Sequence, residues 1–159
     1  MEEYTVKSAL TLNLAIFTEW PKSAFTGMDD AIHLCVIGDN TVQESFMQTS
    51  GKKIGHRKIT LSDITRSGKI AGCHILFIGG QDRIQLSRMQ AAAAGKPILT
   101  IDDINEPTNY RSVVNLPYHD GKIELNINLK LAQQNQLEIS ARLLKLAHIV
   151  SAEPLTDVP

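Results

Sequence analysis

AIHLCVIGD, the stretch at residues 31–39, indicates the fold class. Its first seven residues are almost all apolar, and Gly38-Asp39 ends the run. A short apolar run that is bounded by a turn signal is typical of a strand buried on both faces of a parallel sheet. Two further runs, CHILFI at 73–78 and PILTI at 97–101, predict two more buried strands, and residues 54–60 predict a more exposed one.

Segments with helical spacing alternate with these runs. Val6, Leu10, Leu14 and Phe17 predict a first helix over 3–18 with an apolar stripe toward the core, and the helix must end before Pro21. The other helical segments are expected at 41–49, 62–68 (a weak turn), 81–94, 129–134 and 141–150. Polar residues and a proline at 105–111 predict a loop.

Two shorter strands are expected at 113–116 and 123–127. Asp120-Gly121 lies between them, and because Asp-Gly is a hairpin signal these strands are expected to run antiparallel. We predict a three-layer α/β/α fold with a mostly parallel sheet of about six strands and an antiparallel C-terminal strand. One domain over 1–150 and a frayed tail over 151–159, which contains two prolines, complete the prediction.

Composition excludes some classes of partner. The chain has 159 residues, 43% of them apolar and 21% charged, and a net charge of −1, which gives no attraction to nucleic acid or to an anionic membrane. No apolar run approaches the ~18 residues of a membrane span. The one basic cluster is interpreted as a solvated strand edge; it consists of Lys52, Lys53, His56, Arg57 and Lys58.

The cellular compartment stays open at this level. The chain begins Met1-Glu2-Glu3 without a signal peptide, which fits a cytosolic protein or a mature secreted form. Its two cysteines, Cys35 and Cys73, lie in predicted core strands and are either free thiols or one disulfide.

Three loops at the carboxyl ends of predicted strands are candidates for ligand binding: Gly38-Asp39-Asn40, Gly79-Gly80-Gln81-Asp82 and Asp102-Asp103. They contain neither a dinucleotide fingerprint nor a P-loop lysine. Gly79-Gly80 offers backbone N–H groups to an anion, but glycines at such turns are common for backbone reasons alone. Asp29-Asp30 precedes the first strand, which argues against a phosphoacceptor site.

The histidines do not indicate an enzyme. His33 shares a strand face with Cys35, and a buried, hydrogen-bonded imidazole is the simpler interpretation, while His74 and Cys73 point to opposite faces. The remaining histidines lack metal-ligand spacing. We therefore predict no catalytic residues, no metal and no cofactor.

Trp20 and Pro21 follow the first helix, with Phe17 and Phe25 nearby. Core packing is one interpretation of these side chains. The other is a partner or ligand surface, because Trp is favoured at interaction hot spots.

Taken in order, several stretches make the chain resemble the YfiR-like periplasmic proteins, small bacterial regulators that restrain an inner-membrane diguanylate cyclase. The resemblance spans about residues 5–150 and rests on FTEWP at 17–21, LCVIG at 34–38, CHILFI at 73–78, PILTI at 97–101, NIN at 126–128 and ISARLLKLA at 139–147. The chain departs from the family pattern at Arg111-Ser112-Val113, where Gly-Gly-Met is usual, and at Glu124-Leu125-Asn126, where Arg-Phe-Glu is usual.

The resemblance implies a mature periplasmic form without its signal peptide. It also implies that the protein forms a homodimer. Cys35 and Cys73 match the family's disulfide pair, and the usual strand order 2-1-3-4 makes their strands neighbours. A structural disulfide is therefore expected, with redox sensing as a lesser role.

The implied function is non-enzymatic regulation. The protein would bind the periplasmic domain of a diguanylate cyclase and thereby affect cyclic-di-GMP output and biofilm formation, with no direct insertion into the membrane. The alternative is a periplasmic small-molecule sensor that uses the loops at the carboxyl ends of the strands. The residues expected to form the partner or ligand surface are Phe17, Trp20, Pro21, Gly38, Asp39, Gly79, Gly80 and Gln81.

Overall fold

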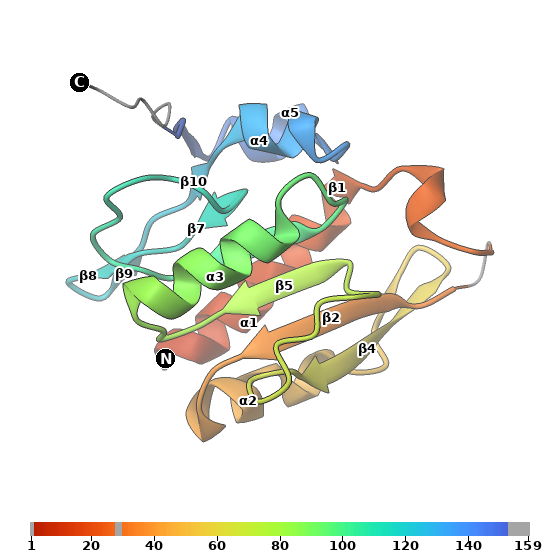
Figure 1. Cartoon of the computed structure of the whole chain (residues 1–159), viewed down its shortest axis with the longest axis horizontal. Coiled ribbons are helices and arrows are strands. Elements are labelled where there is room, and N and C mark those ends of the chain that lie inside the picture. Colours follow the sequence, from red (N-terminus) through yellow and green to blue (C-terminus); the bar gives the residue numbers. More distant parts are fainter. Residues whose placement is uncertain (1, 28–29, 153–159) are drawn as a thin grey trace.

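A mixed, mostly parallel sheet forms the centre of the computed structural model, which describes residues 2–27 and 30–152 (Figure 1). Within these residues the sheet has eight strands in the order β12-β10-β7-β6-β5-β2-β4-β3. Their bounds are β2 Ile32–Ile37, β3 Lys53–Ile54, β4 Arg57–Asp63, β5 Ile75–Ile78, β6 Leu99–Asp102, β7 Val114–Asn115, β10 Asn126–Ile127 and β12 His148–Ile149. Only the β3–β4 and β7–β10 pairs among them are antiparallel.

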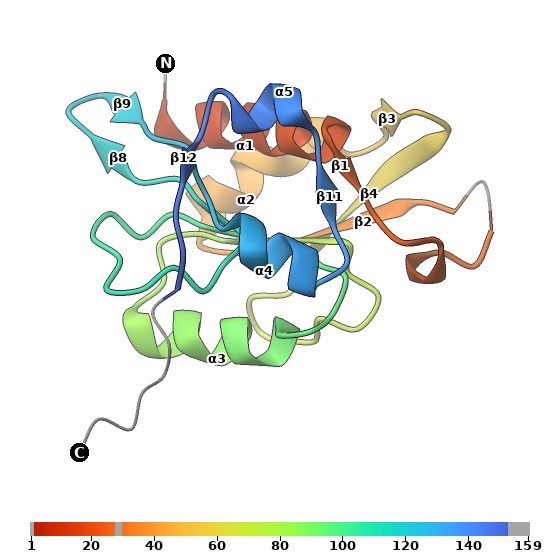
Figure 2. The same cartoon turned by 90° about the horizontal axis from the view of Figure 1, so that it is seen from above.

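Helices cover both faces of this sheet, which confirms the predicted three-layer α/β fold. Figure 2 shows α1 and α2 on one face and α3 on the other, and α4 and α5 gather at the end of the sheet where β10 lies. The helices are α1 Glu3–Ile16, α2 Asn40–Phe46, α3 Arg83–Ala93, α4 Leu129–Gln134 and α5 Ala141–Leu144, with 3-10 turns at Lys22–Ala24 and Met47–Thr49. The four main parallel strands lie in the expected order 2-1-3-4, as β4-β2-β5-β6.

The central strands are buried on both faces, as their apolar runs predicted. In β2, Leu34 and Val36 face the core beneath α1 and α2, whereas Cys35 and Ile37 face the core beneath α3. Successive side chains point to opposite faces of a strand, so one short run supplies both cores.

The C-terminal strands form the predicted antiparallel pair. In β7 and β10, Val114 lies opposite Ile127, and Asp120-Gly121 turns a smaller hairpin of β8 (Tyr118–His119) with β9 (Lys122–Ile123). The basic cluster lies on the β3–β4 hairpin at the edge of the sheet, as expected, and Lys53 pairs with Lys58 there.

Two helix predictions are wrong. Ser62 and Asp63 belong to β4, because pairing with β2 continues to Asp63 and outweighs the weak local helical signal. The helix expected over 141–150 ends at Leu144, and His148–Ile149 instead forms β12, parallel to β10. The backbone N–H of His148 donates to Leu125 O at 2.9 Å and so extends the sheet.

A further strand pair was not anticipated: β1 (Thr18–Glu19) runs antiparallel to β11 (Glu138–Ile139). The face of α1 also differs from the prediction. Lys7 and Thr11 are fully buried, whereas Leu10 is only partly covered. The hydroxyl of Thr11 donates to Lys7 O at 2.8 Å, and this bond lets a polar side chain occupy the buried face. Asp29 and residues 153–159 lie outside the described residues.

Candidate functional site

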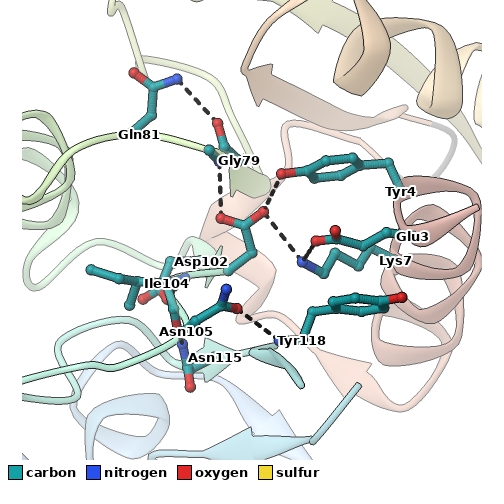
Figure 3. Close-up of polar contacts among 12 residues, drawn as sticks. Glu3, Tyr4, Lys7, Gly79, Gln81, Asp102, Ile104, Asn105, Asn115 and Tyr118 are labelled. Atoms are coloured by element: carbon teal, nitrogen blue, oxygen red, sulfur yellow. Dashed lines mark hydrogen bonds and ion pairs between the residues drawn. The ribbon is translucent and has the colours of Figure 1, made fainter. Parts of the chain in front are cut away.

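The carboxyl edge of the sheet is closed by the first turns of α1. Figure 3 shows Glu3, Tyr4 and Lys7 reaching from α1 toward the loop that contains Gly79 and Gln81. Lys7 is fully buried and pairs with the carboxylate of Glu3, and its Nζ lies 5.0 Å from the centre of the Tyr4 ring. An ammonium group is tolerated at such a depth only when it is paired.

Asp103 is the centre of this contact between α1 and the sheet. Its Oδ2 accepts a 2.7 Å hydrogen bond from the Tyr4 hydroxyl and lies 3.4 Å from Lys7 Nζ. Its Oδ1 accepts the backbone N–H of Gly80 at 2.9 Å. The N–H that a bound anion would require is therefore already satisfied by a carboxylate of the protein itself.

Burial perturbs two groups at this edge. Loss of water raises the pKa of the Tyr4 phenol, and the hydrogen bond to Asp103 adds to the effect. Burial likewise raises the pKa of Asp102, although Ser112 and Asn115 act in the opposite direction. Asp102 begins a buried polar row, because Asn115 Nδ2 donates to its Oδ1 at 2.7 Å and Asn126 donates onward to Asn115 at 3.0 Å.

The other predicted loop residues at this edge have local structural roles. Asp39 caps α2 by accepting the N–H of Val42 at 3.1 Å, and Gln81 donates to Gly79 O at 3.0 Å. A Cβ on Gly38 would lie 2.7 Å from Val42 Cβ, so glycine is required for the close approach of α2 to β2.

The two cysteines form a disulfide, as the family resemblance implied. Their Cα atoms are 5.9 Å apart, and both residues are buried on the face that α3 covers. Cys73 lies in the turn before β5 and not within a strand, and this placement supplies the bend that the pairing requires.

The opposite, amino-terminal edge of the sheet holds Trp20 and a set of stacked rings. Trp20 Nε1 donates to His74 O at 3.0 Å, and the two rings meet edge to face. Phe25 stacks on the His74 ring with centroids 4.5 Å apart, and His33 stacks on it at 5.4 Å. We call Trp20, Phe25, His33 and His74 the aromatic cluster; sequence reasoning had not placed the histidines beside Trp20.

His74 connects two segments through both of its ring nitrogens. Nδ1 lies 2.9 Å from the backbone N of His33 and must accept that N–H, so Nε2 carries the proton and donates to Ala24 O at 2.8 Å. The ring is therefore neutral, and burial lowers the pKa of His74. His33 is exposed, in contrast to the buried imidazole that was expected, and its Nδ1 contacts the Thr60 hydroxyl.

Arg57 contacts the segment that contains Phe25. Its guanidinium lies 3.5 Å from the centre of the Phe25 ring and donates to Gly27 O at 3.1 Å and Asp30 O at 2.9 Å. The interpretation of Arg57 as part of a solvated edge is thus wrong, although its neighbours Lys53 and Lys58 are exposed.

Two grooves flank Trp20 and Pro21. One, of about 490 Å³, contains Pro21 and extends to Gln136 and Glu138. The other, of about 280 Å³, lies between Trp20 and Arg57. Phe17, at the end of α1, is partly buried, and its carbonyl accepts the N–H of Ser140 at 2.8 Å. The predicted surface residues are therefore divided between opposite edges of the sheet.

In the part of the chain that the structure describes, no three His, Cys, Asp or Glu residues are arranged to hold a metal ion. No helix in residues 2–27 and 30–152 has the length and hydropathy needed to cross a membrane.

Comparison with known proteins identifies the family of the chain. Comparison with curated proteins finds no match to the chain. A family model described as YfiR/HmsC-like matches residues 4–148, which run from α1 into β12. The chain belongs to the YfiR/HmsC-like family.

Proposed function

We propose that the protein is a non-enzymatic periplasmic regulator that binds the periplasmic domain of an inner-membrane diguanylate cyclase and restrains it. The family match over residues 4–148 carries this proposal, because it runs from α1 to the first residue of β12 and includes both edges described above. Cyclic-di-GMP output, and with it biofilm formation, would change when the complex forms or dissociates.

The disulfide supports a periplasmic location. Cys35 and Cys73 are 4% and 6% exposed and are joined across a sequence separation of 38 residues. Structural disulfides of this kind persist in oxidising compartments such as the bacterial periplasm.

We propose that the partner contacts the segment from Trp20 to Phe25. The aromatic cluster holds this segment against the sheet, and Trp20 is partly exposed between two grooves. A rigidly held Trp offers a large contact area at little cost in side-chain entropy, which is why Trp is enriched at interaction hot spots.

The small-molecule sensor that uses the carboxyl-edge loops has less support. Asp103 already accepts the Gly80 N–H and the Tyr4 hydroxyl, and Gln81 donates to Gly79. A ligand at this edge would have to displace internal hydrogen bonds between α1 and the sheet.

A binding titration tests the proposed function. The oxidised protein is titrated with the purified periplasmic domain of the diguanylate cyclase encoded nearest to its gene, and the complex is followed by size-exclusion chromatography. Light scattering on the free protein tests the proposed homodimer in the same experiment. We expect a complex under oxidising conditions, and the absence of any complex would refute the proposal.

Two charge reversals locate the contact. Lys22 is exposed and lines both grooves beside Trp20, whereas Lys122 is exposed on β9. Lys22→Glu should weaken the complex about tenfold or more, and Lys122→Glu should leave it unchanged. Equal effects of the two variants would contradict the assignment of the Trp20 segment.

A further inference from the structure

His74 belongs to a stack of side chains at the amino-terminal edge of the sheet. The Arg57 guanidinium lies 3.5 Å from the centre of the Phe25 ring, and the centre of the His74 ring lies 4.5 Å from it. Two groups this close to one ring can avoid overlap only by lying on its opposite faces. His33 also stacks on the His74 ring, so this imidazole has a cation and a second titratable ring as near neighbours.

The segment from Trp20 to Phe25 is attached to the sheet through His74. Residues 20–25 all lie in the described part of the chain, and none of them is buried. Trp20 Nε1 donates to the carbonyl oxygen of His74, and the His74 ring donates to Ala24 O. Phe25 stacks on the same ring. A segment with so little buried surface opens at low cost once such contacts are lost.

The geometry around the His74 ring requires its neutral form. Nδ1 accepts the backbone N–H of His33 at 2.9 Å, and Nε2 donates to Ala24 O at 2.8 Å. A protonated ring has two donors and no acceptor, so its Nδ1–H would oppose the His33 N–H. Its charge would also lie across the Phe25 ring from that of Arg57. Both conflicts are relieved when the ring turns away from His33, and the contacts to the segment are then lost.

Water reaches His74 through a groove of about 460 Å³, which Asp30 and Lys96 also line. The Asp30 carboxylate accepts backbone N–H groups of its own loop at 2.6 and 2.8 Å. Glu19 and Lys22 are exposed and line the groove of about 280 Å³ on the Trp20 segment. The nearest carboxylate is therefore already engaged, and the other groups near the ring include as many cations as anions.

The balance of these groups opposes a charge on His74. Burial lowers its pKa, and the neighbouring His33 and Arg57 act in the same direction. The Ala24 carbonyl and the Asp30 carboxylate act in the opposite direction and do not outweigh burial. A ring that is released to water regains an ordinary pKa of about 6.5. Acid therefore favours the released state.

We propose that His74 is a pH-sensitive switch: protonation of its ring releases the segment from Trp20 to Phe25 and thereby weakens the complex with the partner. Histidine is suited to such a role because its charge changes within the physiological pH range. The effect on the complex rests on the proposed function, whereas the release of the segment is independent of it.

Trp20 is the only tryptophan of the chain, so its fluorescence reports the state of the segment. The whole chain is titrated from pH 7.5 to 5.0 while acrylamide quenching of Trp20 and far-UV circular dichroism are measured. We expect quenching to rise without a change in circular dichroism. The ratio of released to attached segment should increase by up to about tenfold per pH unit below 6.5. Constant quenching, or a rise that coincides with unfolding, would overturn the proposal.

Histidine variants separate His74 from its neighbours. His74→Asn removes the titrating ring, and the oxygen of the new side chain can still accept the His33 N–H. Quenching should then be independent of pH, whereas His33→Gln should keep the rise. His119→Gln, on the exposed end of β8, is the matched control and should behave as the wild type. A wild-type rise in His74→Asn, or its loss in His33→Gln, would overturn the assignment to His74.

Binding of the cyclase domain is then compared at pH 7.5 and 5.5. The wild-type complex should weaken by up to about tenfold, and the complex of His74→Asn should keep its affinity. A complex that is insensitive to pH despite a clear fluorescence transition would refute the regulatory role of His74. If no complex forms at pH 7.5, the proposed function fails, and the fluorescence transition alone decides whether His74 releases the segment.

Discussion

Asp103 is the residue whose replacement most directly tests how α1 is held on the sheet. Asp103→Asn keeps the size of the side chain but removes its charge and one acceptor oxygen. If the remaining oxygen continues to accept the Gly80 N–H, the new amide group faces Lys7 Nζ, so that two donors oppose each other. Lys7 has no exposed surface through which water could compensate.

The expected loss in the free energy of unfolding follows from the contacts that Asp103→Asn removes. Removing one member of a buried ion pair costs about 3–5 kcal/mol. Lys7 keeps its pairing with Glu3, and the Tyr4 hydroxyl can accept a hydrogen bond from the new amide, so the expected cost lies at the bottom of that range or below it. We expect the free energy of unfolding to fall by about 2–3 kcal/mol, which corresponds to a decrease in Tm of about 4–12 °C for a chain of this size.

Urea denaturation at neutral pH, followed by circular dichroism, measures this change. Glu3→Gln is the matched control: the Glu3 side chain is 30% exposed, and its replacement should cost no more than about 1 kcal/mol. The double variant Lys7→Met with Asp103→Asn should be less destabilised than the sum of the two single variants, because the unpaired ammonium is absent.

A small effect of Asp103→Asn on the free energy of unfolding would refute the role of Asp103. If Asp103→Asn unfolds within about 0.5 kcal/mol of the wild type, the Tyr4–Lys7–Asp103 contacts do not hold α1 in place. An additive double variant would likewise show that Lys7 and Asp103 are not coupled.

Three further predictions concern the disulfide, the aromatic cluster and the α2 contact. Replacing Cys35 and Cys73 together by Ala should lower the free energy of unfolding in urea by about 4 kcal/mol in the chain-entropy estimate for the 38-residue separation, and a loss below about 1 kcal/mol would contradict it. Burial lowers the pKa of His74 below its ordinary 6.5, so the unfolded chain binds the proton more readily than the folded one. The free energy of unfolding should therefore decrease as pH falls from 7 to 5. If the His74→Leu variant shows the same dependence of this free energy on pH, His74 is not the cause. Gly38→Ala should destabilise by about 1–3 kcal/mol through its contact with Val42, and a thermal melt that matches the wild type would argue against close packing there.

The apolar runs predicted the buried strands more reliably than any other pattern in the sequence predicted its element. Residues 31–37, 73–78 and 97–101 all contain buried parallel strands, because a strand covered on both faces needs apolar side chains at most of its positions. The two-residue strands β1, β11 and β12 are too short to produce an apolar run that could be recognised in the sequence. They form through hydrogen bonds to distant segments, and β12 replaced the end of a predicted helix for this reason.

The candidate site was predicted less well. The loops after β2, β5 and β6 gather at one edge, as parallel strands require, but Tyr4 and Lys7 from α1 close that edge. A lysine in a helix is ordinarily interpreted as solvated. The polar sequence of the buried face, with Ser8 and Thr11, was the one available signal that this part of α1 faces inward.

The amino-acid sequence by itself determined the α/β class, the order of the main strands and the resemblance to the YfiR-like proteins, because burial and strand length are written in local patterns of apolar residues. Only the tertiary structure decided which polar groups meet. It placed His74 between Trp20 and His33, and Asp103 beside Tyr4, through the packing of segments that are far apart in the chain. Local patterns of apolar residues do not specify these contacts, because each of them depends on how whole elements pack.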